Sequence, residues 1–267
     1  MLCLISVFAF RKQQPSLLVI QNGKTIAERF HVPAGYTRVI STKNSFGEYL
    51  QNTPLKTNGS LVHFYNGQEK PNKVAAAVLN VDVGSKDLQQ CADAVMRLRA
   101  EYLYQNKLYD ALHFNFTNGF NAEYAKWRKG YRIAVKGNNV TWVKTTKESV
   151  SYTSFKEYLN MVFTYAGTAS LNKELKQIAQ KDMQIGDVLI LGGSPGHAVI
   201  VVDMAINTKT NKKLFMVAQS YMPAQDIHIL INKNNPAISP WCELNADAEQ
   251  INTPEWDFFG NEQLKRF

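Results

Sequence analysis

Gly186-Asp-Val-Leu-Ile-Leu-Gly-Gly-Ser-Pro-Gly-His-Ala-Val-Ile-Val-Val-Asp203 is the segment around which we expect this chain to fold. Two apolar runs, Val188 to Leu191 and Ala198 to Val202, flank a cluster of turn-forming residues. This pattern predicts a β-hairpin made of two buried strands. His197 follows the turn directly, so we expect its imidazole at a strand end that the glycines leave open to access.

Further strands are predicted downstream of the hairpin. The segments 214–221 and 227–231 have strand character, and the period-two alternation of a strand places Gln219 and Tyr221 on the same face. Beyond residue 231, proline and tryptophan residues punctuate the chain and predict an irregular tail packed on the surface.

The sequence before the hairpin divides into a β-rich region, 13–83, and a helical region. Asn22-Gly23 is a strong hairpin signal within the first region. From Ser85, an N-cap candidate, apolar residues recur at helical spacing as far as Tyr102 and place Cys91 in the buried stripe of a helix. Two further helices are predicted at 154–166 and, short and basic, at 170–180.

Length, composition and charge narrow the class of protein. The chain has 267 residues, 45% hydrophobic, which suffices for one large or two small domains with a buried core. The net charge of +8 is spread thinly, without a run of five basic residues. We therefore expect a solvated basic surface and no nucleic-acid partner, whereas an anionic wall polymer or a membrane surface would suit the charge.

The cysteines and the first residues indicate whether the protein has disulfides, binds a metal or is exported. Cys3, Cys91 and Cys242 cannot all pair within the chain, and none has the spacing of a metal site, so we expect no disulfide scaffold, no metal and no cofactor. Residues 1–12 are either the remnant of a signal segment or an N-terminal strand. No later stretch approaches the ~20 apolar residues of a membrane span.

An aromatic segment, 110–150, combines rings with polar residues and permits two interpretations. It could line a groove for a sugar or peptide, with Trp127 and Tyr131 contacting the ligand, or form an aromatic core beneath long loops. Ser194 in the glycine-rich turn and Tyr221 beside Gln219 are the other candidates for substrate contact.

Three residues could together perform nucleophilic catalysis. Cys91 lies near a predicted helix N-terminus, where the macrodipole and a neighbouring imidazolium would lower the pKa of its thiol. His197 could act as its base, and Gln219 could orient the imidazole or donate to the oxyanion. In the alternative interpretation Cys91 is a small core residue, and His197 and Asp203 serve only the structure.

The hairpin resembles a known signature. Gly186-Asp187, followed by Gly196-His-Ala-Val-Ile-Val-Val202, is similar to the Gly-Asp and Gly-His motifs of papain-like cell-wall peptidases and amidases of the NlpC type. The resemblance implies an α+β, papain-like core in which an antiparallel sheet packs on the helix that carries Cys91. It also implies that Cys91, His197 and Gln219 are catalytic. The sequence differs at the nucleophile, where Gln90-Cys91-Ala92 replaces the family's Asp-Cys-Ser-Gly.

Over nearly its full length the chain also resembles domain-of-unknown-function family 4846, an uncharacterised bacterial family of mostly exported or lipid-anchored proteins. Three stretches carry this resemblance: Leu88 to Tyr102, Gly192 to His197 and Ala218 to Pro223. The resemblance implies a periplasmic or other cell-envelope location but names no activity.

We therefore expect residues 13–267 to form a single α+β domain, with a papain-like part, 84–267, interrupted by an insertion, 105–150. The expected function is that of a thiol hydrolase or acyltransferase acting on an envelope amide, such as a peptidoglycan peptide. The alternative is a non-catalytic protein that binds wall glycan or peptide through the aromatic segment. The sequence does not specify an oligomeric state.

Overall fold

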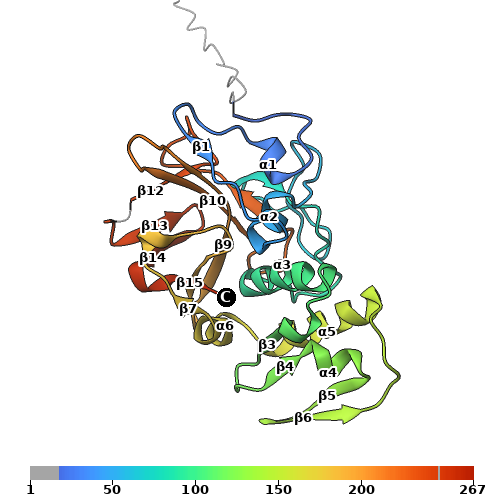
Figure 1. Ribbon diagram of the computed structural model, residues 1–267. Coiled ribbons are helices and arrows are strands. Elements are labelled where there is room, and N and C mark those ends of the chain that lie inside the picture. Colours follow the sequence, from blue (N-terminus) through green and yellow to red (C-terminus); the bar gives the residue numbers. More distant parts are fainter. Residues whose placement is uncertain (1–17, 246) are drawn as a thin grey trace, which may run out of the picture.

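The structure of the chain is a computed structural model that describes residues 18–245 and 247–267. The expectations for residues 1–12, including Cys3, lie outside the described residues. Within them the protein is a mixed α+β molecule built on one large antiparallel sheet (Figure 1).

The large sheet contains nine strands among the described residues, and every pairing in it is antiparallel. Its central strand β9 (His197–Ile206) pairs with β8 (Val188–Leu191) and β10 (Lys213–Gln219), so the predicted hairpin is confirmed with the register Leu191↔His197. The strand order is β2 (Ala75–Val78), β11 (His228–Leu230), β10 (Lys213–Gln219), β9, β8 (Val188–Leu191), β15 (Leu264–Arg266) and β7 (Lys176–Gln177), with β1 (Thr37–Arg38) on β9 and β12 (Cys242–Leu244) on β10.

Both faces of β9 are buried, which explains its nearly continuous apolar sequence. Ala198, Ile200 and Val202 face helix α3 (Cys91–Gln105) in the main core. The alternate residues Val199 and Val201 belong to a second core. That core lies under the hairpin of β13 (Gln250–Thr253) and β14 (Trp256–Gly260). The strand is therefore fixed from two sides, and so is the position of His197 at its start.

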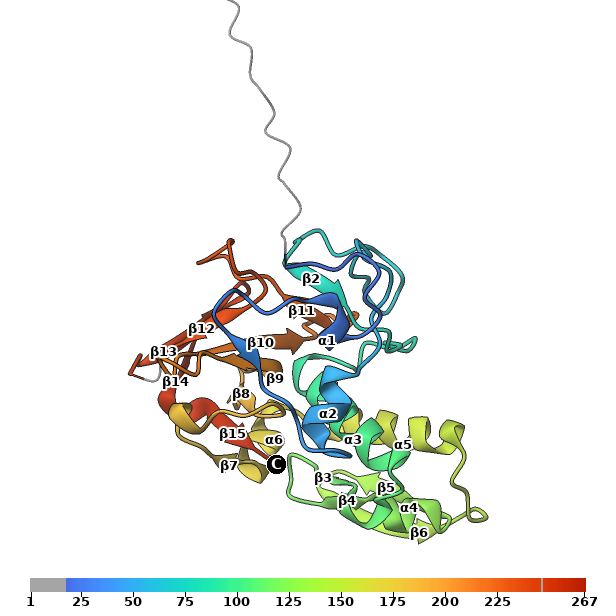
Figure 2. The same ribbon diagram turned by 45° about the horizontal axis from the view of Figure 1, so that its top comes forward.

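A separate lobe follows α3 in the chain and lies on the other side of that helix from the β13–β14 hairpin (Figures 1 and 2). Its core is aromatic: Tyr124, Phe155 and Tyr158 are fully buried and their rings contact one another. The lobe contains the 3₁₀ turn Tyr109–Ala111, β3 (His113–Asn115), β4 (Asn121–Glu123), α4 (Tyr124–Arg128), β5 (Tyr131–Lys136), β6 (Asn139–Lys144) and α5 (Tyr152–Tyr165).

The remaining helices are short and connect these parts. Two of them, α1 (Ile26–Arg29) and α2 (Phe46–Gln51), lie in the N-terminal region, and α6 (Thr168–Glu174) follows α5. Additional 3₁₀ turns occur at Gln180–Asp182 and Asn261–Gln263. No helix of the described residues is long and apolar enough to cross a membrane.

Four expectations for the secondary structure were wrong. The helix expected at 170–180 begins at Thr168 and ends at Glu174, and the chain continues into the short strand β7. Between residues 18 and 83 the structure has only the short strands β1 and β2, together with two helices and isolated bridges, so this part of the chain is less β-rich than expected. At Asn22-Gly23 the chain turns and enters α1 instead of a second strand, and a Cβ on Gly23 would lie 2.5 Å from the Glu28 carbonyl oxygen. The expected irregular tail contains four strands, of which β15 inserts between β8 and β7.

Candidate active site

The turn between β8 and β9 fixes the place of His197. This turn packs against the start of α6, and Gly196 is required there because a Cβ would lie 2.4 Å from the Gly193 carbonyl oxygen and 2.5 Å from Thr168 Oγ1. His197 is 1% exposed and is the first residue of β9, as the sequence predicted. The glycine-rich turn therefore holds the imidazole at the end of a buried strand.

Cys91 is the first residue of α3 and Gln90 is its N-cap, so the helix begins five residues later than an N-cap at Ser85 predicts. Tertiary contacts hold the preceding segment out of the helix. The Asp87 carboxylate accepts a hydrogen bond from the backbone N–H of Ala224 (2.7 Å), and the Ser220 hydroxyl donates to the Gln89 carbonyl oxygen (2.9 Å). These bonds tie residues 87–89 to the loop after β10 and bring Cys91 to the helix N-terminus.

Cys91 and His197 line the same pocket, which has a volume of about 400 Å³. The backbone N–H of Ala198, the residue after His197, acts on the Cys91 sulfur and favours its thiolate form, so the thiol lies beside the start of β9. The walls come from the N-terminus of α3, the start of α6, the glycine-rich turn, the loop after β10 and the start of β14, with the lining residues Asp93, Thr168, Ser194, Tyr221, Met222 and Trp256.

Burial keeps both candidate catalytic groups neutral at pH 7. Burial, with a smaller contribution from Asp93, raises the pKa of the Cys91 thiol to about 11, against the backbone N–H groups that favour the thiolate. Burial also lowers the pKa of the His197 imidazole to about 4, although Gln219 and Glu255 favour the charged form. The expectation of a lowered thiol pKa was wrong, because desolvation exceeds the helix dipole and no imidazolium is present at neutral pH.

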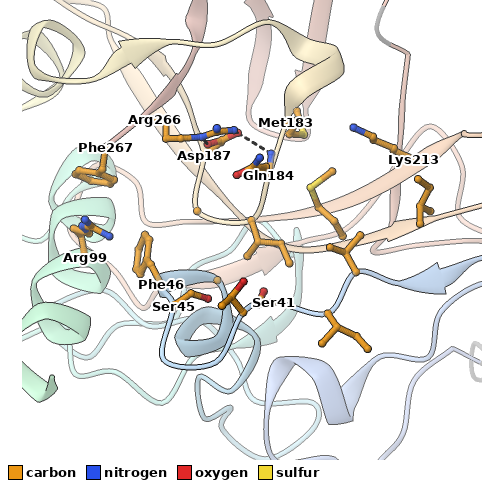
Figure 3. Close-up of a pocket in the computed structure, with 18 residues that line it drawn as sticks. Ser41, Ser45, Phe46, Arg99, Met183, Gln184, Asp187, Lys213, Arg266 and Phe267 are labelled. Atoms are coloured by element: carbon orange, nitrogen blue, oxygen red, sulfur yellow. Dashed lines mark hydrogen bonds and ion pairs between the residues drawn. The ribbon is translucent and has the colours of Figure 1, made fainter.

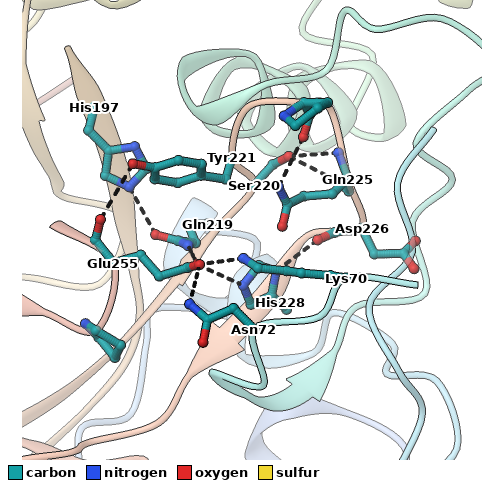
Figure 4. Close-up of polar contacts among 12 residues, drawn as sticks. Lys70, Asn72, His197, Gln219, Ser220, Tyr221, Gln225, Asp226, His228 and Glu255 are labelled. Atoms are coloured by element: carbon teal, nitrogen blue, oxygen red, sulfur yellow. Dashed lines mark hydrogen bonds and ion pairs between the residues drawn. The ribbon is translucent and has the colours of Figure 1, made fainter. Parts of the chain in front are cut away.

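The hydrogen bonds of Gln219 determine which nitrogen of His197 carries the proton. Glu255 is ionised and can only accept, so the Gln219 amide nitrogen faces Glu255 Oε2 at 2.6 Å (Figure 4). The amide oxygen of Gln219 must then face His197 Nε2, at 2.9 Å, and that nitrogen is the donor. His197 Nδ1 remains unprotonated and makes no hydrogen bond within the described residues, so it is the nitrogen available as a base.

Glu255 holds the far side of Gln219 in a buried charged cluster. Its Oε2 accepts from Lys70 Nζ at 2.5 Å and its Oε1 from Asn72 at 2.9 Å, while His228 Nε2 lies 3.9 Å away (Figure 4). Burial alone would raise the pKa of the Glu255 carboxyl, but His228 and Lys70 outweigh it and lower that pKa to about 2. The Glu255 carboxylate therefore lies ionised behind Gln219, where it favours the charged form of His197 while the neighbouring Lys70 and His228 oppose it.

Aromatic rings enclose the imidazole. Trp256 stacks on His197 with 5.1 Å between ring centroids, and Tyr221 is tilted against it at 4.8 Å. Phe259 lies 6.1 Å away on the same side as Trp256. These rings exclude water from one side of His197, which accounts for the lowered pKa, and they leave the side toward the pocket as the access route.

The structure brings five of the seven predicted site residues together. Cys91, His197, Ser194 and Tyr221 line the pocket, and Gln219 holds His197 from behind. Asp203 lies farther along β9, where it forms an ion pair with Arg38 (2.9 Å). This agrees with the structural role that the alternative interpretation of the sequence assigns to it.

Trp127 and Tyr131 are not at the pocket. Trp127 is 4% exposed in the core of the lobe, and its indole N–H donates to the Ser154 carbonyl oxygen at 3.0 Å. Arg132 covers its ring, with the guanidinium carbon 4.1 Å from the ring centroid. The described structure therefore offers no open aromatic groove at Trp127, and substrate contact by these two residues stays a prediction.

Four site residues were not found from the sequence. Lys70, Glu255 and Trp256 come from regions assigned to a β-rich segment and an irregular tail, and no local pattern marks them. Asp93 had a signal, because it lies two residues after Cys91 in the first turn of α3. Its Oδ2 accepts from the Gln90 backbone N–H (3.1 Å), its Oδ1 has no partner among the described residues, and burial raises its pKa well above the usual range.

No group of three His, Cys, Asp or Glu residues in the described part of the chain could hold a metal ion, and Cys91 and Cys242 are free. A family model described as "Domain of unknown function (4846)" matches residues 26–266. Comparisons with curated proteins and with solved structures gave no match.

Proposed function

The chain belongs to the family described as Domain of unknown function (4846), whose description names no activity, and we propose its function from the site: a thiol hydrolase or acyltransferase that acts on an amide bond. One observation carries the proposal. Cys91 at the N-terminus of α3 and His197 at the start of β9 line one pocket, and Gln219 holds the imidazole in a defined tautomer. A nucleophile, a base and an orienting group are the parts that such catalysis needs.

The neutral pair acts by general base catalysis. His197 Nδ1 takes the thiol proton as the Cys91 sulfur attacks the amide carbonyl carbon. The backbone N–H groups of Cys91 and Ala92, at the positive end of α3, stabilise the oxyanion of the tetrahedral intermediate. The intermediate collapses as the C–N bond breaks, and the imidazolium gives its proton to the leaving amine. Water or an acceptor nucleophile then cleaves the thioester, with His197 again as base.

The charged cluster behind His197 supports the same step. While His197 carries a proton on Nδ1 its imidazole is positive. The negative charge of Glu255 stabilises this imidazolium because Gln219 links the two groups by hydrogen bonds. Gln219 is thereby assigned the orienting role, because its amide oxygen accepts from His197 and its amide nitrogen donates to Glu255. Lys70 keeps Glu255 ionised and in place.

The finer fold and the substrate belong to the same proposal. A helix that begins with the nucleophile and packs on an antiparallel sheet beginning with the histidine is the arrangement expected of a papain-like protein of the NlpC type. The resemblance of the Gly-His strand to cell-wall peptidases and amidases supports a peptidoglycan peptide as substrate, in the periplasm or elsewhere in the cell envelope. The net charge of +8 suits an anionic wall polymer.

The test is turnover of soluble peptidoglycan fragments, followed by the release of new amino groups or of transferred products. Cys91→Ala and His197→Ala should each abolish turnover while the melting temperature stays within a few degrees of wild type. Cys242→Ala, the matched control, removes a buried thiol outside the pocket and should retain activity. Turnover that persists in Cys91→Ala would remove the thiol mechanism.

A further inference from the structure

A second and larger pocket, of about 600 Å³, lies away from Cys91. It forms where the loop before α2, the middle of α3 and the segment before β8 meet the end of β9 (Figure 3). Arg99 of α3 lines it, eight residues and therefore about 12 Å along the helix from Cys91. The two pockets share no lining residue, so the second one is a separate site.

Arg99 is an unpaired cation in this pocket. Its guanidinium carbon lies 5.0 Å from the ring centroid of Phe46, 5.4 Å from that of Tyr102 and 5.1 Å from that of Phe267. Within residues 18–245 and 247–267, no carboxylate or carbonyl oxygen accepts a hydrogen bond from it. Burial lowers the pKa of this guanidinium. Rings stabilise the charge through their faces but do not replace in-plane acceptors for the N–H groups.

The other charged groups of the pocket leave this positive charge uncompensated. Asp187 is fully buried, and Arg266 neutralises it through two hydrogen bonds of 2.6 and 2.8 Å. Lys213 adds a second positive charge at the opposite end of the pocket from Arg99 (Figure 3), where its Nζ donates to the Lys181 carbonyl oxygen. Among the side chains that line the pocket, the positive charges therefore outnumber the negative ones, because Asp187 is the acidic side chain in the lining and is already paired.

The rest of the lining is apolar with a few hydroxyls. Val39 is 36% exposed and Ile40 is 90% exposed at the rim, and Met183, Met204 and Ile206 continue the apolar wall. The hydroxyls of Ser41 and Thr42 make no hydrogen bond to other described residues. A ligand that fits these features needs one anionic group and an apolar body, and the volume is in the range of small-molecule sites.

We propose that this pocket binds a small organic carboxylate with an apolar body, whose carboxylate pairs with Arg99 and whose body lies along Val39, Ile40 and Met204. The planar carboxylate matches the guanidinium fork, and a single guanidinium at this end suits a monoanion better than a phosphate dianion. This function is additional to the chemistry proposed at Cys91 and does not depend on it.

Calorimetric titration of the whole protein with octanoate tests the proposal. Octanol and octylamine are matched in the apolar body but lack the carboxylate, and inorganic phosphate lacks the apolar body. Octanoate should bind at least about tenfold more tightly than any of the three, which is the contribution of one charged hydrogen-bonded pair. Undetectable octanoate binding, or equal binding of octanol, would overturn the proposal.

Variants test whether octanoate binds in the pocket of Arg99. Arg99→Gln should weaken octanoate binding about tenfold or more, and so should Ile40→Asp, whose exposed position makes it safe for the fold. Lys209→Gln removes an exposed charge outside the pocket and should bind as wild type does, and Cys91→Ala should also leave octanoate affinity unchanged. Unaltered affinity in both Arg99→Gln and Ile40→Asp would assign the binding elsewhere and refute the site.

Discussion

The protonation state of Cys91 leads to the most quantitative prediction. Burial raises the pKa of its thiol from the ordinary value of 9.0 to about 11. Each pKa unit changes the thiolate fraction tenfold, so at pH 8 the folded protein should hold about 100-fold less Cys91 thiolate than an ordinary thiol does. Only the thiolate is alkylated, so modification of Cys91 should slow by at least that factor relative to the denatured chain.

The assay is pulsed alkylation with iodoacetamide between pH 5 and pH 10.5, with the Cys91 peptide quantified by mass spectrometry. The rate should rise about tenfold per pH unit across most of this range, without a plateau at low pH. Cys242, whose pKa burial raises to about 12, should be slower with the same slope. In His197→Ala the slope should persist, because a histidine with a pKa of about 4 supplies no positive charge at neutral pH.

A plateau of Cys91 alkylation below pH 7 that disappears in His197→Ala would refute this reasoning. It would mean that the attraction between a thiolate and an imidazolium exceeds the cost of burying both charges. The chemistry at Cys91 would then begin from an ion pair instead of a neutral pair.

Two further predictions concern stability. Glu255→Gln leaves Lys70 buried without its counter-charge and should lower the free energy of unfolding at pH 7 by about 3 kcal/mol in urea titrations, whereas the exposed Glu249→Gln should change little. Because the pKa of Glu255 is lowered to about 2, the advantage of wild type should be complete above about pH 4.5, the unfolded value, and should be lost as the pH falls from 4.5 to 2. Equal urea midpoints at pH 7 would contradict this account. Gly196→Ala should lower the free energy of unfolding by about 1–3 kcal/mol and reduce any turnover, because its Cβ would meet Gly193 and Thr168. Gly167→Ala, with no atom within 4 Å of the new Cβ, should be nearly neutral. Equal melting temperatures of these two variants would show that the turn accommodates the added methyl group.

The centre of the fold was predictable because its determinants are local. β8 occupies the predicted residues 188–191, and β9 and β10 begin within one residue of the predicted starts. Strands buried on both faces have continuous apolar sequences, and the glycine cluster between these two strands is typical of a tight turn. His197 and Gln219 followed from these strands by counting residues.

The rest of the site depends on contacts that no local pattern encodes. The helical spacing from Ser85 is real, but the bonds from Asp87 and Gln89 to the loop after β10 stop the helix at Cys91. Glu255 lies 36 residues from Gln219 in a segment rich in proline and tryptophan. Glu255 reaches Gln219 only when the β13–β14 hairpin packs on β9. That packing is a tertiary contact, which the residue propensities of the segment do not predict.

The two halves of the Gly-Asp and Gly-His motif lie at different pockets of the structure. Gly196 and His197 belong to the pocket that contains Cys91, whereas Gly186 and Asp187 lie at the pocket of Arg99. Gly186 has a φ of +98° and lets Phe46 approach, since a Cβ there would lie 3.0 Å from the Phe46 ring. Asp187 binds Arg266 and thereby anchors β15 beside β8. The Gly-Asp half of the motif therefore supports the sheet and the second pocket, and only the Gly-His half contributes to the candidate chemistry.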